Sequence, residues 1–201
     1  MKMFKHRFPI LLLLAGMGLA STAQASLIAR LGGQAVYDTD LNITWLANAN
    51  LAGTTMDWTT ANTWAAGLTV GGFTGWRLPT ADPACGQNYN CINSELGHLY
   101  YTELGVTANN GITSSTSPYL ALFTNVQNSV YWSGTEYAPN PNIAWYFNTA
   151  TGGQNIFTKD FILHAWAVRS GDVGSVPEPG VIGLFGVGAL AWAGTWHKRR
   201  G

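Results

Sequence analysis

Short apolar and aromatic runs, separated by glycine, proline and asparagine, fill most of the middle of the chain. Residues 35–37 and 43–46 are two such runs on either side of the polar segment 38–42, and this order predicts a β-hairpin. β-Branched and aromatic residues between such turn formers favour antiparallel strands. The other strands expected on this ground are residues 130–132, 143–147, 155–157 and 165–168.

Two segments have the three- and four-residue spacing of apolar side chains that is typical of an amphipathic helix. The first carries Ala61, Trp64, Ala65 and Leu68, and the second carries Leu96, Leu99, Tyr100 and Leu104. Asn93 or Ser94 can cap the second helix, and Gly105 ends it. Two helices followed by a strand-rich half predict an α+β fold, in which both helices pack on an antiparallel sheet.

The first 25 residues have the three parts of a secretory signal peptide. A basic start within residues 2–7 precedes an apolar run of eleven residues, 10–20, and the small residues Ala23 and Ala25 predict cleavage before Ser26. An N-terminal membrane anchor is the alternative. Eleven helical residues span only about 16 Å, however, against a bilayer core of roughly 30 Å. We therefore expect export and cleavage by signal peptidase.

The C-terminal end combines a proline-rich motif, an apolar segment and a basic cluster. The motif is Val176, Pro177, Glu178 and Pro179, and the cluster is Lys198, Arg199 and Arg200. Residues 181–196 between them carry no charge and predict a membrane helix of about 24 Å, with its basic end in the cytoplasm. A buried core helix is the alternative, but such a helix is seldom both apolar on all sides and closed by basic residues.

These three parts, in this order, resemble the PEP-CTERM sorting tail, here residues 176–201. The resemblance implies recognition and cleavage by exosortase, a membrane transpeptidase-like enzyme of Gram-negative bacteria that make exopolysaccharide. It also implies that the protein crosses the inner membrane and is held there transiently by its C-terminal helix. The protein then reaches the cell surface or the extracellular matrix.

Residues 26–175 have the length of one domain, and we expect them to form the ectodomain. Only 10% of the 201 residues are charged. The ectodomain holds nine acidic and four basic side chains, which gives a net charge of −5. A negative domain is a poor partner for phosphate backbones, so we expect no nucleic-acid binding. Acidic polysaccharides are repelled at long range as well, unless cations bridge them.

Cys85 and Cys91 are the two cysteines of the chain. Disulfides form in exported proteins, so a structural disulfide is the leading expectation. A redox or nucleophilic pair is the alternative. Such a pair calls for C-x-x-C spacing or an adjacent base, and the sequence shows neither clearly.

A second resemblance starts from the block Gly75, Trp76, Arg77, Leu78, Pro79 and Thr80. Together with residues 36–38, 44–45, 95–96, 131–135 and 167–169, this block resembles the Lcl C-terminal domain family. The resemblance covers most of residues 36–169. It implies a fold similar to C-type lectins, and some members of the family bind glycans. The chain departs from the family pattern at residues 81–93, an insertion that carries both cysteines.

Asp38, Asp40 and Asn42 begin like a calcium loop. Ile43 and Ala49 stand where an EF-hand needs glycine and glutamate, so we expect a solvated hairpin turn instead. The sequence predicts no metal site and no cofactor, with calcium as the alternative.

Glu95 and His98 share one face of the second predicted helix. A di-metal helical bundle needs two such pairs, so we expect a first-turn glutamate and a surface histidine. Arg77 lies between two apolar residues, and we expect it to pair with Asp38 or Glu95, because a buried guanidinium needs a partner. The tryptophans expected in the core are Trp45, Trp64, Trp76, Trp132, Trp145 and Trp166.

Glu136, Tyr137, Asn140 and Asn142 form a candidate ligand loop, because polar and aromatic groups on a loop can meet a sugar. An ordinary hairpin loop is the alternative. No G-x-S-x-G elbow is present, and we predict no catalytic residue. The function predicted from the sequence is non-catalytic binding, or a structural role, in the exopolysaccharide layer. The alternative is a secreted enzyme on a C-type-lectin-like scaffold that uses Cys85 and Cys91.

Overall fold

The computed structural model of the protein describes residues 26–174. The predicted signal peptide, residues 1–25, and the predicted membrane helix at 181–196 lie outside the described residues. Within residues 26–174, no helix is both long enough and apolar enough to cross a membrane.

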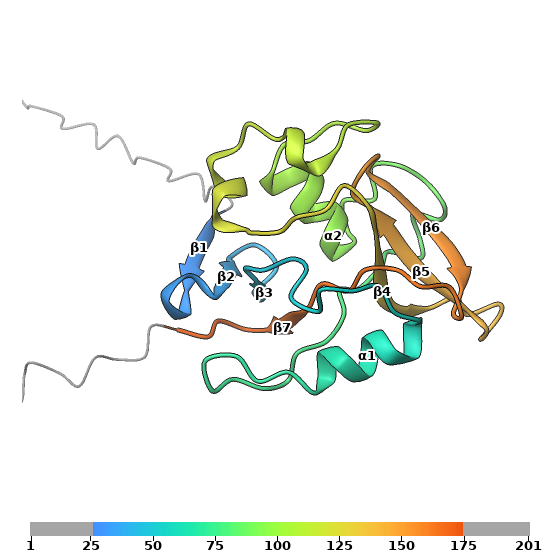
Figure 1. Ribbon diagram of the computed structural model, residues 1–201. Helices are drawn as coiled ribbons and strands as arrows, with labels where there is room; N and C mark the ends of the chain where they lie inside the picture. The colour runs from blue at the N-terminus through green and yellow to red at the C-terminus, as the bar shows by residue number, and fades with distance from the viewer. Residues whose placement is uncertain (1–25, 175–201) are drawn as a thin grey trace, which may run out of the picture.

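Two antiparallel sheets form the body of the domain (Figure 1). The first sheet has the order β1 (Leu27–Arg30), β2 (Ala35–Asp38), β3 (Ile43–Leu46) and β7 (Val168–Ser170). The second has the order β4 (Val130–Glu136), β5 (Ile143–Asn148) and β6 (Gly153–Thr158). In Figure 1 both ends of the described chain lie on the side of the first sheet, and β5 and β6 lie on the opposite side.

The two α-helices are short, and each has a side-chain cap at its N-terminus. Helix α1 spans Trp58–Ala66, and the Asp57 carboxylate before it accepts a hydrogen bond from the Thr60 amide. Helix α2 (Glu95–Gly97) follows the Ser94 cap and continues into η2 (His98–Glu103), a π-helical turn. Three 3₁₀ turns, η1 (Leu31–Gly33), η3 (Ile112–Ser114) and η4 (Pro118–Leu122), complete the helical part.

The predicted α+β fold and the predicted hairpin are confirmed, since β2 pairs with β3. The strands expected at 130–132 and 143–147 are present as β4 and β5, which pair with each other. The prediction of a single sheet is wrong. Strand β1 was not expected, and the last strand is Val168–Ser170 rather than 165–168. The preceding segment connects the two sheets: the Trp132 amide donates to the His164 carbonyl, and the Leu46 amide donates to the Ala167 carbonyl.

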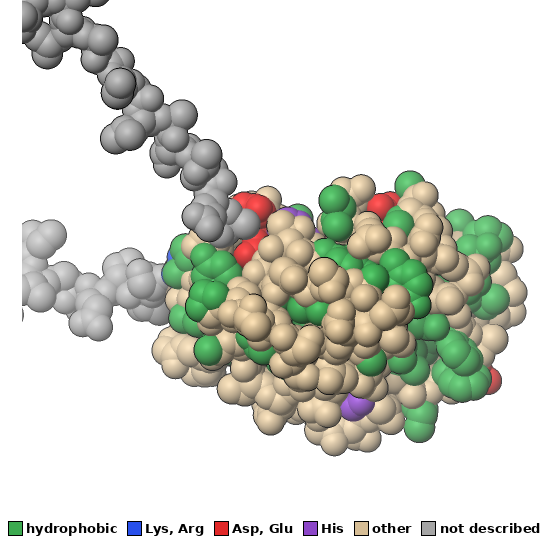
Figure 2. Space-filling view, turned by 90° about the horizontal axis from the view of Figure 1, so that it is seen from above, with side chains coloured by type: hydrophobic (Ala, Val, Ile, Leu, Met, Phe, Trp, Pro, Cys, Tyr) green, Lys and Arg blue, Asp and Glu red, His purple; other side chains and the backbone are tan. Residues whose placement is uncertain are grey.

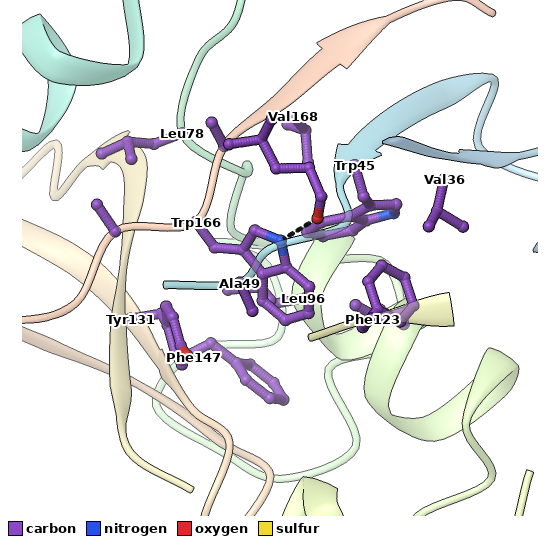
Figure 3. Close-up of a cluster of buried hydrophobic side chains, with 14 of the residues drawn as sticks. Val36, Trp45, Ala49, Leu78, Leu96, Phe123, Tyr131, Phe147, Trp166 and Val168 are labelled. Carbon is purple, nitrogen blue, oxygen red and sulfur yellow. Dashed lines mark hydrogen bonds between the residues drawn. The ribbon is translucent and has the colours of Figure 1, made fainter. Parts of the chain in front are cut away.

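The core lies between the two sheets and the helical segment, and tryptophans fill much of it (Figure 3). Trp45, Trp132 and Trp166 are fully buried, and Trp76 and Trp145 nearly so, which confirms five of the six predicted core tryptophans. Trp64 is only half-buried, because it lines a hollow of about 470 Å³ on the outer face of α1. The buried indole N–H groups of Trp166 and Trp132 donate to the Leu46 and Met56 carbonyls.

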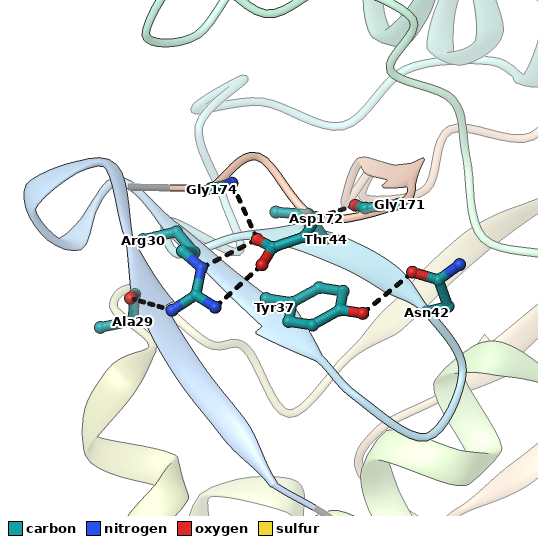
Figure 4. A network of polar contacts seen from close by, with 8 residues as sticks. All are labelled: Ala29, Arg30, Tyr37, Asn42, Thr44, Gly171, Asp172 and Gly174. Carbon is teal, nitrogen blue, oxygen red and sulfur yellow. Dashed lines mark hydrogen bonds and ion pairs between the residues drawn. The ribbon is translucent and has the colours of Figure 1, made fainter. Parts of the chain in front are cut away.

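A polar network ties the first strand to the segment after the last one (Figure 4). Arg30 makes two hydrogen bonds to the Asp172 carboxylate, of 2.8 and 2.9 Å, and the Thr44 hydroxyl donates to the Gly171 carbonyl at 2.7 Å. The C-terminal end of the described chain is therefore held beside the end of β1.

Candidate functional site

A cleft of about 250 Å³ lies between the cysteine-bearing insertion and the second sheet. We call it the tyrosine cleft. Its lining residues are Gln87, Asn88, Tyr89, Tyr146, Asn148, Thr151, Gly153, Gln154 and Asn155. None of them is charged, and two present aromatic rings among amide and hydroxyl groups. In Figure 1 the insertion runs beside β6, on the side away from the chain ends.

The insertion is held in place by a disulfide and by one buried glutamine. Cys85 and Cys91 are bonded, with an S–S distance of 2.05 Å, which confirms the expected disulfide. Gln154 on β6 is 2% exposed, and its amide donates to the Asp82 and Gly86 carbonyls and accepts from the Asp82 amide. One wall of the tyrosine cleft is therefore fixed to the sheet that forms the other wall.

Removing the disulfide is expected to destabilise the domain modestly. The closed loop is short, so replacing Cys85 and Cys91 together by serine should cost about 2 kcal/mol of unfolding free energy. Denaturant unfolding of the full chain with and without reductant measures this cost. The serine variant is the control, since reductant should not affect it. Equal stability of the wild type in both conditions would contradict a stabilising disulfide.

The candidate ligand loop lies at the β4–β5 turn, and most of its side chains are engaged within the domain. Glu136 accepts a 2.7 Å hydrogen bond from Lys159, the Tyr137 ring packs edge-on against Trp145, and the Asn140 side chain accepts from the Asn142 amide. Ile143, next to this loop, pairs with Thr158, whereas Asn148, in the cleft, pairs with Gly153 at the other end of β5. The loop and the tyrosine cleft are thus separate surfaces, and ligand binding at the loop stays a prediction.

Arg77 and Glu95 form the structural pair that the sequence predicted. The guanidinium makes two hydrogen bonds of 2.7 and 2.6 Å to the carboxylate, which also accepts one from the Thr80 amide. The bond to Glu95 raises the pKa of Arg77, which stays charged. Because Glu95 is fully engaged here, it is unavailable to His98.

His98 lies instead beside Glu103 and Asp38, and we call these three residues the acid–histidine cluster. The Nε2 atom of His98 is 3.4 Å from Oε1 of Glu103. Asp38 is fully buried and Glu103 is 5% exposed. Two sequence expectations are therefore wrong: Asp38 is not a solvated turn residue, and His98, with 13% of its side chain exposed, is not a surface histidine.

The π turn explains why the sequence pattern missed this cluster. Each residue of an α-helix rotates by about 100°, so side chains five residues apart diverge by about 140°. In η2 the hydrogen bonds span five residues, as the 2.9 Å bond from the Leu104 amide to the Leu99 carbonyl shows. The wider turn brings His98 and Glu103 to one side, where α-helical spacing had paired His98 with Glu95.

The β2–β3 turn holds Asp38, the third residue of the acid–histidine cluster, in a fixed orientation. Oδ1 of Asp38 accepts hydrogen bonds from the Asp40 and Leu41 amides, so the turn itself is confirmed. Burial raises the pKa of Asp38, and the bond from Leu41 only partly opposes it. The Glu103 carboxylate raises the pKa of His98, against the effect of burial. Asp40, 3.8 Å from His98, lies at the rim.

One face of the domain carries few charged side chains. The face drawn in Figure 2 shows mainly apolar and uncharged polar side chains, with acidic groups gathered beside a histidine at one end. Lys and Arg surface shows only as a small area at one edge of this face in Figure 2.

The family comparisons agree with the motifs in the sequence. The family model of the Lcl C-terminal domain matches residues 34–169, and that of the PEP-CTERM protein-sorting motif matches residues 175–200. No curated protein matches the chain. The sorting motif implies export, processing by exosortase and transient membrane anchoring before the protein reaches the cell surface. The chain thus belongs to the Lcl C-terminal domain family and is an exported surface protein sorted by exosortase.

Proposed function

We propose that this protein is a non-catalytic, lectin-like component of the exopolysaccharide layer and that it binds neutral carbohydrate in the tyrosine cleft. The observation that carries this proposal is the composition of the cleft: Tyr89 and Tyr146 among side-chain amides, with no charged residue in the lining. The position of the cleft supports it further. The strands β5 and β6 and the insertion, which line the cleft, lie on the side of the domain away from the C-terminal end of the described chain (Figure 1).

The chemistry of the cleft matches a polyhydroxylated ligand. A tyrosine ring offers a flat apolar face and a polar tip, and amides both donate and accept hydrogen bonds. Tyr89 is 42% exposed and therefore accessible. An uncharged lining favours a neutral chain over an acidic one, and the net charge of −5 on residues 26–175 acts in the same direction.

The disulfide supports binding over catalysis. The alternative, a secreted enzyme that uses Cys85 and Cys91, needs a free thiolate as nucleophile. Both sulfur atoms are bonded to each other, and the loop between them forms a wall of the tyrosine cleft. A scaffold role accounts for this arrangement without a reduction step.

Binding of the full-length chain, purified in detergent, to arrays of neutral and acidic polysaccharides tests the proposal. We expect binding to neutral polymers, and we expect Tyr89→Ala to weaken it at least tenfold. Because Tyr89 is exposed, this change should alter the unfolding free energy by only about 0.5 kcal/mol.

Asn140→Ala, in the candidate ligand loop, is the matched control and should leave binding unchanged. Binding that is lost with Asn140→Ala but kept with Tyr89→Ala would move the site to the β4–β5 turn. Binding to no polymer would reject the carbohydrate proposal.

A further inference from the structure

The acid–histidine cluster contains buried polar atoms that lack hydrogen-bond partners. These atoms are Oδ2 of Asp38, Nε2 of His98, and both carboxylate oxygens of Glu103. Asp38 is fully buried and Glu103 is 95% buried. Buried side-chain oxygens nearly always have a partner, and an unpaired buried carboxylate is costly. Nε2 of His98 and Oε1 of Glu103 face each other at 3.4 Å, which leaves the other carboxylate oxygens for a positively charged ligand. A metal ion can accept a lone pair from each carboxylate and from the neutral form of the imidazole.

No basic side chain of the described residues fills this role. The four Lys and Arg residues between 26 and 174 contact other groups: Arg30 contacts Asp172, Arg77 contacts Glu95, Lys159 contacts Glu136, and Arg169 contacts the Thr74 carbonyl. When Asp38 and Glu103 are ionised, one imidazolium offsets only half of their charge. Asp40 at the rim adds to the negative potential.

We propose that Asp38, His98 and Glu103 bind a single divalent transition-metal ion, for which Zn²⁺ is the best match. Their ligand atoms lie within 4.8 Å of one another. Tetrahedral zinc with bonds of about 2.0–2.1 Å separates its ligands by roughly 3.3 Å, close to the 3.4 Å between Nε2 of His98 and Oε1 of Glu103. Asp40, 3.8 Å from His98, lies at the rim and is not part of this set of three.

The ligand set selects the class of metal. An imidazole with carboxylates suits Zn²⁺ and neighbouring transition metals, whereas Ca²⁺ and Mg²⁺ prefer oxygen ligands alone. The orientation of Asp38 fits this role, because Oδ1 is held by two backbone amides. Oδ2 is buried and faces no cation, with the Trp45 indole as its neighbouring side-chain donor. A bound ion would link the β2–β3 turn to η2.

Calorimetric titration of the chelator-treated full-length chain with Zn²⁺, Mn²⁺, Ca²⁺ and Mg²⁺ tests this site. We expect one Zn²⁺ per chain at micromolar affinity or tighter, weaker Mn²⁺ binding, and no binding of Ca²⁺ or Mg²⁺ at this affinity. Glu103→Gln and His98→Gln should each weaken Zn²⁺ binding by about 100-fold or more. Mutation of a residue that only hydrogen-bonds to a metal ligand already lowers metal affinity about 10–100-fold, and these two residues would be ligands themselves.

Glu136→Gln and His164→Gln are the controls, because these residues lie outside the cluster and should leave the affinity unchanged. Zn²⁺ should also raise the Tm of the wild type but not that of Glu103→Gln, because a ligand stabilises only a folded state that binds it. This melting experiment shows as well whether the variant is folded. Absence of Zn²⁺ binding, binding that survives both cluster substitutions, or a preference for Ca²⁺ would overturn the proposal.

Discussion

Replacing Trp166 by alanine is expected to lower the free energy of unfolding by about 4 kcal/mol, the usual cost of deleting a buried tryptophan. The Trp166 ring is fully buried (Figure 3). Its centroid lies 5.3 Å from those of both Trp45 and Phe123, and 5.7 Å from that of Tyr131. The substitution would leave a cavity where the two sheets meet and would remove the indole hydrogen bond to the Leu46 carbonyl.

Denaturant unfolding monitored by far-ultraviolet circular dichroism measures this loss. Trp64→Ala is the matched control, since it removes the same side chain from a half-buried position on α1 and should cost only about 1 kcal/mol. Typical domains are stable by about 5–15 kcal/mol, so Trp166→Ala should unfold at much lower denaturant concentration. Equal losses for the two variants would contradict the central position of Trp166.

Removing the charge of Arg77 should lower the free energy of unfolding by more than removing the charge of its partner Glu95. Arg77→Met leaves Glu95 unpaired at 9% exposure, and we expect a loss of about 3 kcal/mol. Glu95→Gln keeps an oxygen that can accept from the Thr80 amide. It leaves a guanidinium whose side chain is 36% exposed and can be hydrated, so we expect about 1 kcal/mol.

Equilibrium unfolding of both variants and of the double variant measures this asymmetry. In the double variant the unpaired carboxylate is gone, so its stability should exceed that of Arg77→Met alone. Lys159→Met is the control, because its partner Glu136 is half exposed and such pairs contribute about 1 kcal/mol or less. A smaller loss of unfolding free energy for Arg77→Met than for Glu95→Gln would contradict the expectation that the buried, unpaired carboxylate is the larger cost.

Local features of the fold were predictable because they depend on neighbouring residues. The turn at 38–42 separates two apolar runs, and β2 and β3 pair around it as expected. Spacing and export likewise predicted the bond between Cys85 and Cys91. The sequence predicted that Arg77 pairs with Asp38 or Glu95, and in the structure it pairs with Glu95.

Features that combine distant segments were missed. The tyrosine cleft needs the insertion at Tyr89 to lie against Tyr146 on β5, and no periodicity in either segment predicts this contact. The split into two sheets depends on the segment at 164–167, whose hydrogen bonds reach β4 at one end and β3 at the other. A run of apolar residues does not show which strands it will contact.

The sequence alone determined the family, the sorting motif, the α+β class and the β2–β3 hairpin, because each depends on contiguous residues or short spacings. Only the tertiary structure decided which carboxylate faces His98. The α-helical period assigned Glu95 to it, whereas the π register of η2 and the pairing of Glu95 with Arg77 place Glu103 and Asp38 there instead. The register of a helix, and which carboxylate pairs with which basic group, depend on contacts from the whole domain. The local periodicity of apolar residues does not predict these contacts.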